Sequence, residues 1–186
     1  MIVFRCFPWD AGVADGARGG ALWFPRMLQG AGRHDNPELY GCLYVTETPV
    51  AAVVERLQGL RGGTLDAADL TSGGRPLALA AVELADEAGL VDLDDPRVLA
   101  GERLRPSLVA TNDRSLTQAQ AAAIHGAHEE AAGMRWWSTF ESLWLNVTLF
   151  DRAERFLGEA DVRALALADD AVGDAARFLG IRVDLT

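Results

Sequence analysis

Strand-like and helix-like patterns are intermingled along this chain, without the regular alternation that a doubly wound parallel sheet requires. Residues 2–7 and 43–46 are rich in β-branched and aromatic residues and predict strands. Further strands are predicted at residues 77–84, 90–93, 134–139 and 145–150. The pattern favours an α+β fold, and 186 residues most simply form a single domain, 1–186.

The clearest helix signal follows the second predicted strand. Thr48 is placed as an N-cap, Pro49 suits the first helical position, and apolar residues recur at helical spacing through Leu57. The segment before that strand, residues 11–32, is rich in glycine and is expected to be irregular.

A second helix is predicted in the C-terminal half. Ser115-x-x-Gln118 has the form of a capping box, which predicts a helix through about Glu130 that Gly133 ends. In the tail, residues 162–167 fit a strand or a helix.

Charge restricts the classes of function. The net charge of −10 argues against a protein that follows nucleic-acid phosphates with its surface. All 17 basic residues are arginine, so an anion site must use guanidinium groups or backbone N–H groups. The absence of lysine excludes Schiff-base chemistry on a lysine side chain.

The two cysteines, Cys6 and Cys42, form no disulfide framework or redox motif, which suits a reducing compartment. Arg5 and Asp10 interrupt the apolar start expected of a signal peptide, and no apolar run approaches the ~20 residues of a membrane span. A cytoplasmic location is expected.

Two arginines are candidates for binding an anion. Arg33 follows Gly32 in a flexible run and can bind a phosphate through its guanidinium fork, or it can be a surface arginine paired with Asp35 or Glu38. Arg26 has the same two interpretations.

Glu55 and Tyr44 are further candidates. Glu55 lies on the flank of the predicted helix, where it is either solvated or directed into a cleft as a base or an anionic stabiliser. Tyr44 alternates with Leu43 and Val45, so its ring points away from them and can stack on a ligand or fill a secondary core.

Ser138 and Asn146 interrupt two apolar strands with polar side chains. Ser138 follows Trp136 and Trp137, and a buried hydroxyl there requires a hydrogen-bond partner. Each residue alone indicates a site only weakly.

Other motifs indicate no chemistry. His125 and His128 have the i, i+3 spacing of a metal pair, but no third ligand is evident, so an exposed helical pair is favoured. The chain has no phosphate-binding P-loop, no dinucleotide-binding glycine motif after a strand and no nucleophile elbow around Ser138.

The order of these residues resembles the RES-domain family, which is named for an arginine, a glutamate and a serine. The N-terminal resemblance lies in residues 32–37 (Gly-Arg-His-Asp-Asn-Pro), 41–45 (Gly-Cys-Leu-Tyr-Val) and 49–55 (Pro-Val-Ala-Ala-Val-Val-Glu). The C-terminal resemblance lies in residues 117–118 (Thr-Gln), 133–138 (Gly-Met-Arg-Trp-Trp-Ser) and 146–150 (Asn-Val-Thr-Leu-Phe). It covers roughly residues 20–152 and leaves 153–186 as a C-terminal extension of strand and helix.

The resemblance implies a fold similar to that of the ADP-ribosyltransferases, a split mixed β core with flanking helices and NAD in a cleft. It implies phosphorolysis or hydrolysis of the nicotinamide glycosidic bond, with Arg33, Glu55 and Ser138 as catalytic residues. Tyr44, Arg26 and Asn146 are the expected substrate-binding residues. No cofactor or metal is implied; NAD is the substrate and inorganic phosphate a candidate co-substrate.

The resemblance also implies partners. Family members are usually toxins held by a cognate antitoxin that blocks the cleft. Neither direct nucleic-acid binding nor membrane binding is expected, and a homo-oligomer is compatible with the sequence. Two alternatives stay open: transfer of ADP-ribose to a protein, and a catalytically silent binding module, which the residues at His34 and Glu141 allow.

Overall fold

The computed structural model describes residues 1–184 and contains two compact units. The first unit comprises Met1 and residues 24–45 and 84–158; the second comprises residues 2–23, 46–83 and those from Glu159 onward. Both units combine strands with helices, so the α+β class is confirmed. Each unit is described by itself.

The first unit is built on a mixed sheet. Its strands follow the order β2 (Cys42–Thr46), β8 (Leu145–Phe150), β7 (Gly133–Trp137) and β6 (Leu90–Asp92). β7 is antiparallel to β8 and parallel to β6. The first residue of β7 is Gly133. Only glycine fits at this position, because a Cβ there would lie 2.3 Å from the carbonyl oxygen of Thr148 on the neighbouring strand.

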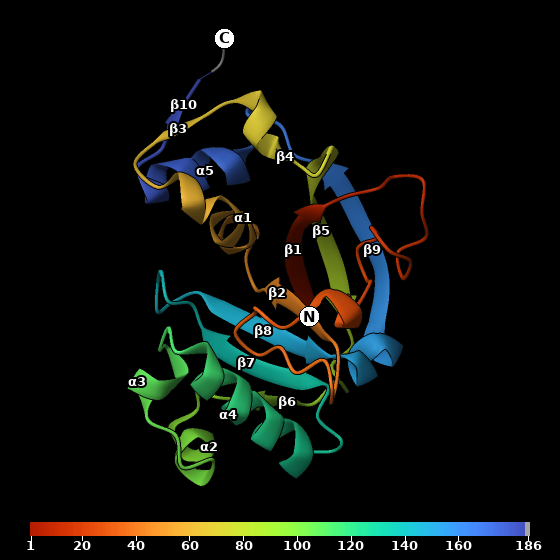
Figure 1. Cartoon of the computed structure of the whole chain (residues 1–186), viewed down its shortest axis with the longest axis vertical. Coiled ribbons are helices and arrows are strands. Elements are labelled where there is room, and N and C mark those ends of the chain that lie inside the picture. The colour runs from red at the N-terminus through yellow and green to blue at the C-terminus, as the bar shows by residue number, and fades with distance from the viewer. Residues whose placement is uncertain (185–186) are drawn as a thin grey trace. The chain divides into compact units, whose positions relative to one another are not determined.

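Helices of the first unit pack against this sheet (Figure 1). They are α2 (Pro96–Gly101), α3 (Pro106–Val109) and α4 (Arg114–Ala127), with 3-10 turns η1 (Arg26–Leu28) and η4 (Asp151–Phe156). Ala121 and Ile124 of α4 are buried together with Met134, Trp136 and Phe150 of the sheet. This core supports the segment that carries Arg33.

The second unit places strands beside a pair of helices. β5 (Arg75–Leu84) lies antiparallel to β1 (Ile2–Pro8) and β4 (Thr71–Ser72), and it also pairs with β9 (Leu157–Ala164). α1 (Pro49–Leu57) packs against β1 and against α5 (Asp170–Leu179).

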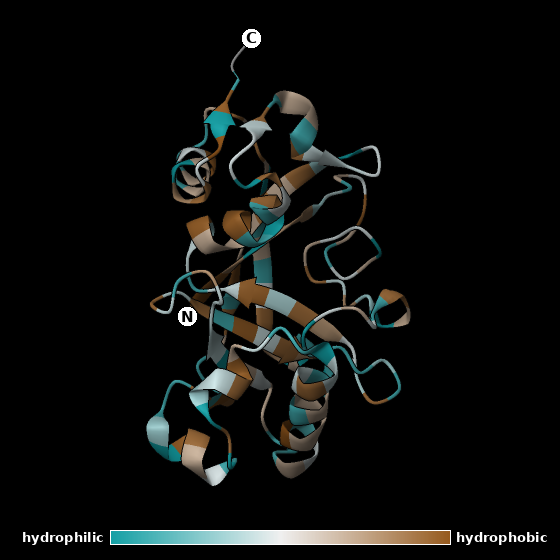
Figure 2. Cartoon of the chain, turned by 60° about the vertical axis from the view of Figure 1, so that its left-hand side comes forward, coloured by the Kyte–Doolittle hydropathy of each residue, from teal (hydrophilic) through white to brown (hydrophobic). Residues whose placement is uncertain are grey.

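Smaller elements complete the second unit. β3 (Thr64–Leu65) pairs in parallel with β10 (Arg182–Val183), and 3-10 turns occur at η2 (Gln58–Leu60) and η3 (Ala67–Leu70). In Figure 2 the strands carry much of the hydrophobic colour, whereas the connecting loops are of mixed colour.

The predicted strands are confirmed, and so is the start of α1, where the Thr48 hydroxyl accepts a hydrogen bond from Ala51 N. In the tail, where residues 162–167 fitted a strand or a helix, strand β9 continues through Ala164 and is followed by α5. Ser138, predicted to lie on a strand, follows directly after β7.

The predicted capping box of the C-terminal helix is wrong. Asp113 is the N-cap of α4, since its carboxylate accepts from Leu116 N, and Ser115 instead donates its hydroxyl to Asp113. The helix also ends at Ala127 rather than near Glu130, and Gly133 opens β7 instead of closing the helix. Aspartate and serine are both good N-cap residues, and in the structure it is the Asp113 carboxylate that accepts from the free N–H group of Leu116.

Candidate active site

Three consecutive polar residues of the irregular segment before β2 are buried in the first unit. Arg33, His34 and Asp35 are 7%, 3% and 6% exposed. Helix α4 holds the backbone of this segment: the Thr117 hydroxyl donates to Arg33 O at 2.6 Å, and Gln118 Nε2 donates to Gly32 O at 2.9 Å. Buried polar groups require such partners, so α4 fixes the segment in place.

The Arg33 side chain is anchored by backbone oxygens. Its Nη1 donates to Val109 O at 3.2 Å and to Thr111 O at 2.5 Å, at the end of α3 and in the following loop. The guanidinium carbon lies 5.1 Å from the ring centre of Trp136, within cation–π range. The first unit therefore holds a buried, oriented positive charge.

His34 is a neutral imidazole inside this arrangement. Its Nδ1 lies 2.8 Å from Thr148 Oγ1, which also accepts from the indole N–H of Trp136 at 3.1 Å. The Trp136 ring meets the imidazole edge-on, with ring centres 5.0 Å apart. Burial, reinforced by the positive charges of Arg33 and Arg114, lowers the pKa of His34 well below its ordinary value.

Tyr44 on β2 joins the same network through its hydroxyl. The hydroxyl accepts from His34 N at 2.9 Å and donates to Asp35 Oδ1 at 2.7 Å. Burial, the neighbouring Cys42 and the Asp35 carboxylate raise the pKa of Tyr44 well above its ordinary value, so the phenol stays protonated.

We call Arg33, His34, Asp35, Tyr44, Trp136 and Thr148 the Arg33 cluster. Asn146 adjoins it through strand geometry, and Ser138 lies directly after β7. Asn146 pairs with Trp136 across β7 and β8, and residues opposite each other on neighbouring strands share a face of the sheet.

Ser138 lies two residues after Trp136, directly beyond the end of β7. It is 3% exposed, its N–H donates to Trp144 O, and its hydroxyl oxygen accepts from Phe140 N at 3.2 Å. Arg33, Tyr44, Ser138 and Asn146, predicted from widely separated parts of the sequence, thus lie in one unit around Trp136.

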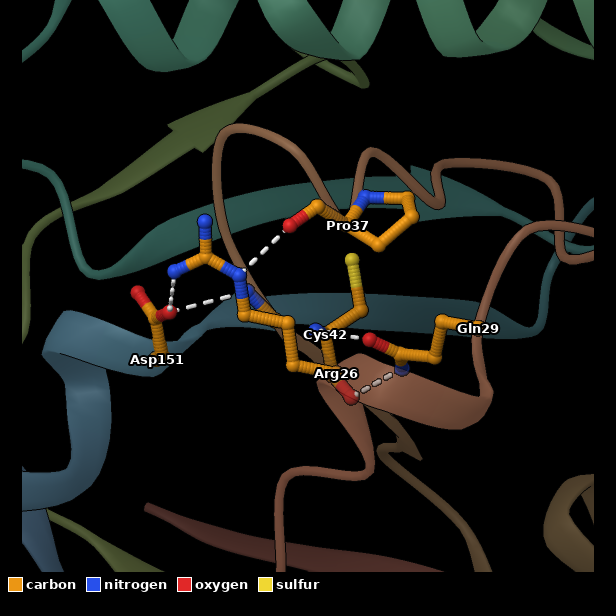
Figure 3. A network of polar contacts seen from close by, with 6 residues as sticks. Arg26, Gln29, Pro37, Cys42 and Asp151 are labelled. Atoms are coloured by element: carbon orange, nitrogen blue, oxygen red, sulfur yellow. Dashed lines mark hydrogen bonds and ion pairs between the residues drawn. The ribbon is translucent and has the colours of Figure 1, made fainter.

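Arg26 lies in a separate polar network, drawn in Figure 3. Its Nε donates to Pro37 O at 2.6 Å, and its Nη1 lies 3.5 Å from the carboxylate of Asp151, which also accepts from Gly41 N. Gln29 braces the same region by exchanging two hydrogen bonds with the backbone of Cys42. These contacts hold the segment before β2 in place. Substrate binding by Arg26 stays a prediction.

Glu55 belongs to the second unit, on the last turns of α1. Val53 and Val54 beside it are fully buried, whereas Glu55 is half-buried, which places it on the flank of the apolar face as the sequence predicted. Its catalytic role stays a prediction.

His125 of α4 and His128, the C-cap of that helix, are partly buried and contact other side chains, so the exposed helical pair favoured by the sequence is wrong. His125 stacks on Tyr40, with ring centres 4.4 Å apart, and meets Phe150 edge-on at 4.9 Å. His128 Nε2 lies 2.7 Å from Glu102. Within residues 1–184, no group of three or more histidine, cysteine or acidic residues could hold a metal ion.

A separate groove of about 850 Å³ lies along β6 and the end of α4. Four acidic residues line it, Glu87, Asp92, Glu129 and Glu130, against one arginine, Arg155. Such a lining disfavours an anionic ligand, so this groove is a poor site for a nucleotide diphosphate.

Sequence reasoning missed His34, Asp35 and Thr148 as members of the site. Their contacts join distant residues, such as His34 to Thr148, which no local pattern encodes. The one available signal was Thr117-Gln118, whose side chains hold the backbone around Arg33.

Comparison with protein families assigns the chain. The model of the RES domain matches residues 7–170, which is most of the chain. This range is wider than residues 20–152, over which the sequence motifs resemble the family. The chain belongs to the RES-domain family. No curated protein sequence matches it. Among the described residues of this RES-domain chain, no helix has the length and apolar character needed to cross a membrane.

Proposed function

We propose that this RES-domain chain degrades NAD by breaking the bond between nicotinamide and ribose. The observation that carries the proposal is the buried Arg33, fixed by two carbonyls and lying over the ring of Trp136, in a chain that the RES-domain model matches over residues 7–170. Burying a guanidinium costs folding free energy, and the fork of a guanidinium held in a fixed orientation matches the oxygens of a phosphate, which supports an anionic ligand.

The reaction makes modest demands on the protein. Nicotinamide in NAD is already cationic, so it leaves as a neutral molecule with the bonding electron pair and needs no general acid. The ribose carbon becomes oxocarbenium-like and takes an oxygen from phosphate or water, which loses a proton to solvent. The protein must fix the phosphates and stabilise the positive ribose.

Each proposed role follows from a residue's chemistry. Arg33 binds the diphosphate, or inorganic phosphate as the incoming nucleophile, because a guanidinium fork matches phosphate oxygens. Tyr44 presents its ring to the nicotinamide, since its hydroxyl is engaged by His34 and Asp35. Ser138, with Asn146, hydrogen-bonds the ribose or the carboxamide, and Glu55 stabilises the developing positive charge.

The biological setting belongs to the same proposal. An enzyme that consumes NAD without restraint is toxic to its host, so we propose that the chain is the toxin of a toxin–antitoxin pair, acting in the cytoplasm. The antitoxin would be a separate protein that blocks access to Arg33. The acidic surface suits a partner with basic contact residues.

The test is NAD consumption by the purified protein, with and without inorganic phosphate, with products separated by chromatography. Nicotinamide with ADP-ribose 1″-phosphate would establish a phosphorylase, and nicotinamide with free ADP-ribose a glycohydrolase. ADP-ribose found on an added protein would establish the transferase. NAD left intact by folded protein would contradict the proposal and favour a silent binding module.

Glu55→Gln provides the internal check, with the exposed Glu83→Gln in the same unit as its matched control. Turnover should be lost in Glu55→Gln and retained in Glu83→Gln. Full activity of folded Glu55→Gln would remove the assigned role of this carboxylate.

A further inference from the structure

The carboxylate of Asp35 connects parts of the Arg33 cluster that would otherwise be independent. Its Oδ2 accepts from Gly30 N at 2.8 Å and from Gly32 N at 2.7 Å, on the N-terminal side of Arg33. Its Oδ1 accepts from the hydroxyl of Tyr44 on β2 at 2.7 Å. One buried side chain thus joins the Arg33 segment to the strand that carries Tyr44.

The backbone of Gly32 lies very close to the carboxylate of Asp35. A Cβ at Gly32 would lie 2.5 Å from Asp35 Oδ1 and 2.7 Å from its Cγ and Oδ2. Only glycine lets the backbone come close enough for both N–H groups to reach one carboxylate oxygen. The backbone here is shaped around Asp35.

The same contacts decide what Asp35 can do. Three donors already occupy its two oxygens, so it is placed to orient other groups rather than to take a proton from a substrate. The Tyr44 hydroxyl is likewise used twice, donating to Asp35 and accepting from His34 N. What Tyr44 has left to offer a ligand is its ring.

We infer that Asp35 is the positioning residue of the site: it fixes the position of the Tyr44 ring relative to Arg33, so that both side chains contact one nucleotide. This inference rests on the proposed function. Hydrogen bonds to a charged acceptor are the stronger kind, and this one sets the geometry of an aromatic surface. Loss of the carboxylate frees the ring and weakens binding of NAD more than it slows bond cleavage.

The experiment compares Asp35→Ala and Asp35→Asn with the wild type in steady-state NAD turnover. Asp35→Ala should raise KM for NAD about tenfold and lower kcat by less than about threefold, because ground-state binding is what it disturbs. Asp35→Asn keeps one acceptor oxygen and the shape of the side chain, so its KM should lie between the other two. This graded rescue is not expected of a residue that only stabilises the fold.

A double-mutant cycle with Tyr44→Phe tests whether Asp35 acts through the phenol. Tyr44→Phe removes the hydroxyl that Asp35 holds, so adding Asp35→Ala should raise KM less than it does in the wild type. Independent effects on KM in the two backgrounds would overturn the inference.

Asp151→Asn is the matched control. Asp151 also accepts a backbone N–H, from Gly41, and pairs with Arg26, but it lies outside the Arg33 cluster. Its replacement should lower the melting temperature and leave KM unchanged. An unchanged KM in folded Asp35→Ala, with only a lower melting temperature, would also overturn the inference.

The assay separates this inference from the proposed function. A wild type that consumes NAD, with Asp35 variants of normal KM, would contradict the inference alone. If the wild type leaves NAD intact, the proposed function fails, and the dissociation constant of NAD from calorimetry replaces KM in the same comparison. A wild type that does not bind NAD would overturn both.

Discussion

Arg26 and Arg33 lie in the same irregular segment, and both donate hydrogen bonds to backbone carbonyls. Arg26 remains 40% exposed on its side chain and pairs loosely with Asp151, at 3.5 Å, in a network that closes the segment before β2. Arg33 is 7% exposed and lies beside a neutral histidine, a tyrosine and two strands with polar residues. Two arginines that look alike in sequence therefore have different surroundings.

The comparison shows what distinguishes a site from a structural contact. The contacts of Arg26 with Pro37 and Asp151 keep a loop in place. Around Arg33 the buried groups bring together a charge, the ring of Trp136 and the polar strand residue Thr148. Burial of so many polar groups is costly for the fold, and function is the best account of why the chain bears that cost.

Replacing each arginine in turn tests the difference between them most directly. Arg33→Ala should reduce NAD turnover about 100-fold, because the phosphates lose the group that positions them. Arg26→Ala should reduce turnover much less than Arg33→Ala does and lower the free energy of unfolding by about 1 kcal/mol or less, as expected of a partly exposed ion pair. Turnover and urea denaturation of both variants measure this; a larger turnover loss in Arg26→Ala would reverse our assignment.

The shape of the Arg33 segment can be tested at Gly32. Gly32→Ala places a Cβ against the Asp35 carboxylate and should lower the free energy of unfolding by about 2–3 kcal/mol. Gly126→Ala is the control: it meets no atom within 4 Å on α4, where alanine favours a helix by about 1 kcal/mol. Urea denaturation should therefore give opposite signs for the two variants, and equal stabilities would argue against the close contact.

A smaller effect is expected at Thr148, whose hydroxyl contacts both His34 and Trp136. Thr148→Val leaves these buried groups without that partner and should cost about 1–3 kcal/mol of unfolding free energy. The exposed Thr139→Val serves as the comparison and should change stability by less than about 0.5 kcal/mol. Matching losses in the two variants would show that the Thr148 contacts contribute nothing.

The smallest expected effect is a dependence of stability on pH. Because the pKa of His34 is lowered in the folded protein, the unfolded chain binds a proton first as the pH falls below about 6.5. Stability should then decline with falling pH, by at most about 1.4 kcal/mol per pH unit from this group. The lowered pKa of the less buried His125 acts in the same direction.

Urea denaturation at pH 7 and pH 5.5 measures this loss. His34→Gln should reduce it more than His125→Gln does. An undiminished loss in His34→Gln would show that another group is responsible.

Much of the fold could be predicted because its signals are local. Alternating and apolar runs predicted β1, β2, β5, β7 and β8, and Thr48-Pro49 placed the start of α1. The start of α4 was mistaken because Asp113 and Ser115 are both good N-cap residues and only the observed hydrogen bond to Leu116 N decides between them. The short helices α2 and α3 carry too few residues for a periodic pattern.

The site was predictable in its parts but not in its connections. Arg33, Tyr44, Ser138 and Asn146 were proposed from sequence, and the first unit gathers them around Trp136. The contacts that hold them join distant residues, such as Arg33 with Val109 and Thr111. Local chemistry cannot reveal that Asp35 meets Tyr44, because that meeting depends on the folded path of the segment between them.

The most direct test of the central claim is a crystal structure of the protein with NAD, using Glu55→Gln to slow turnover. We expect the diphosphate within about 3 Å of the Arg33 guanidinium, the usual length of a charged hydrogen bond, and the nicotinamide against the ring of Tyr44. NAD bound away from Arg33, for instance in the groove along β6, would contradict the account.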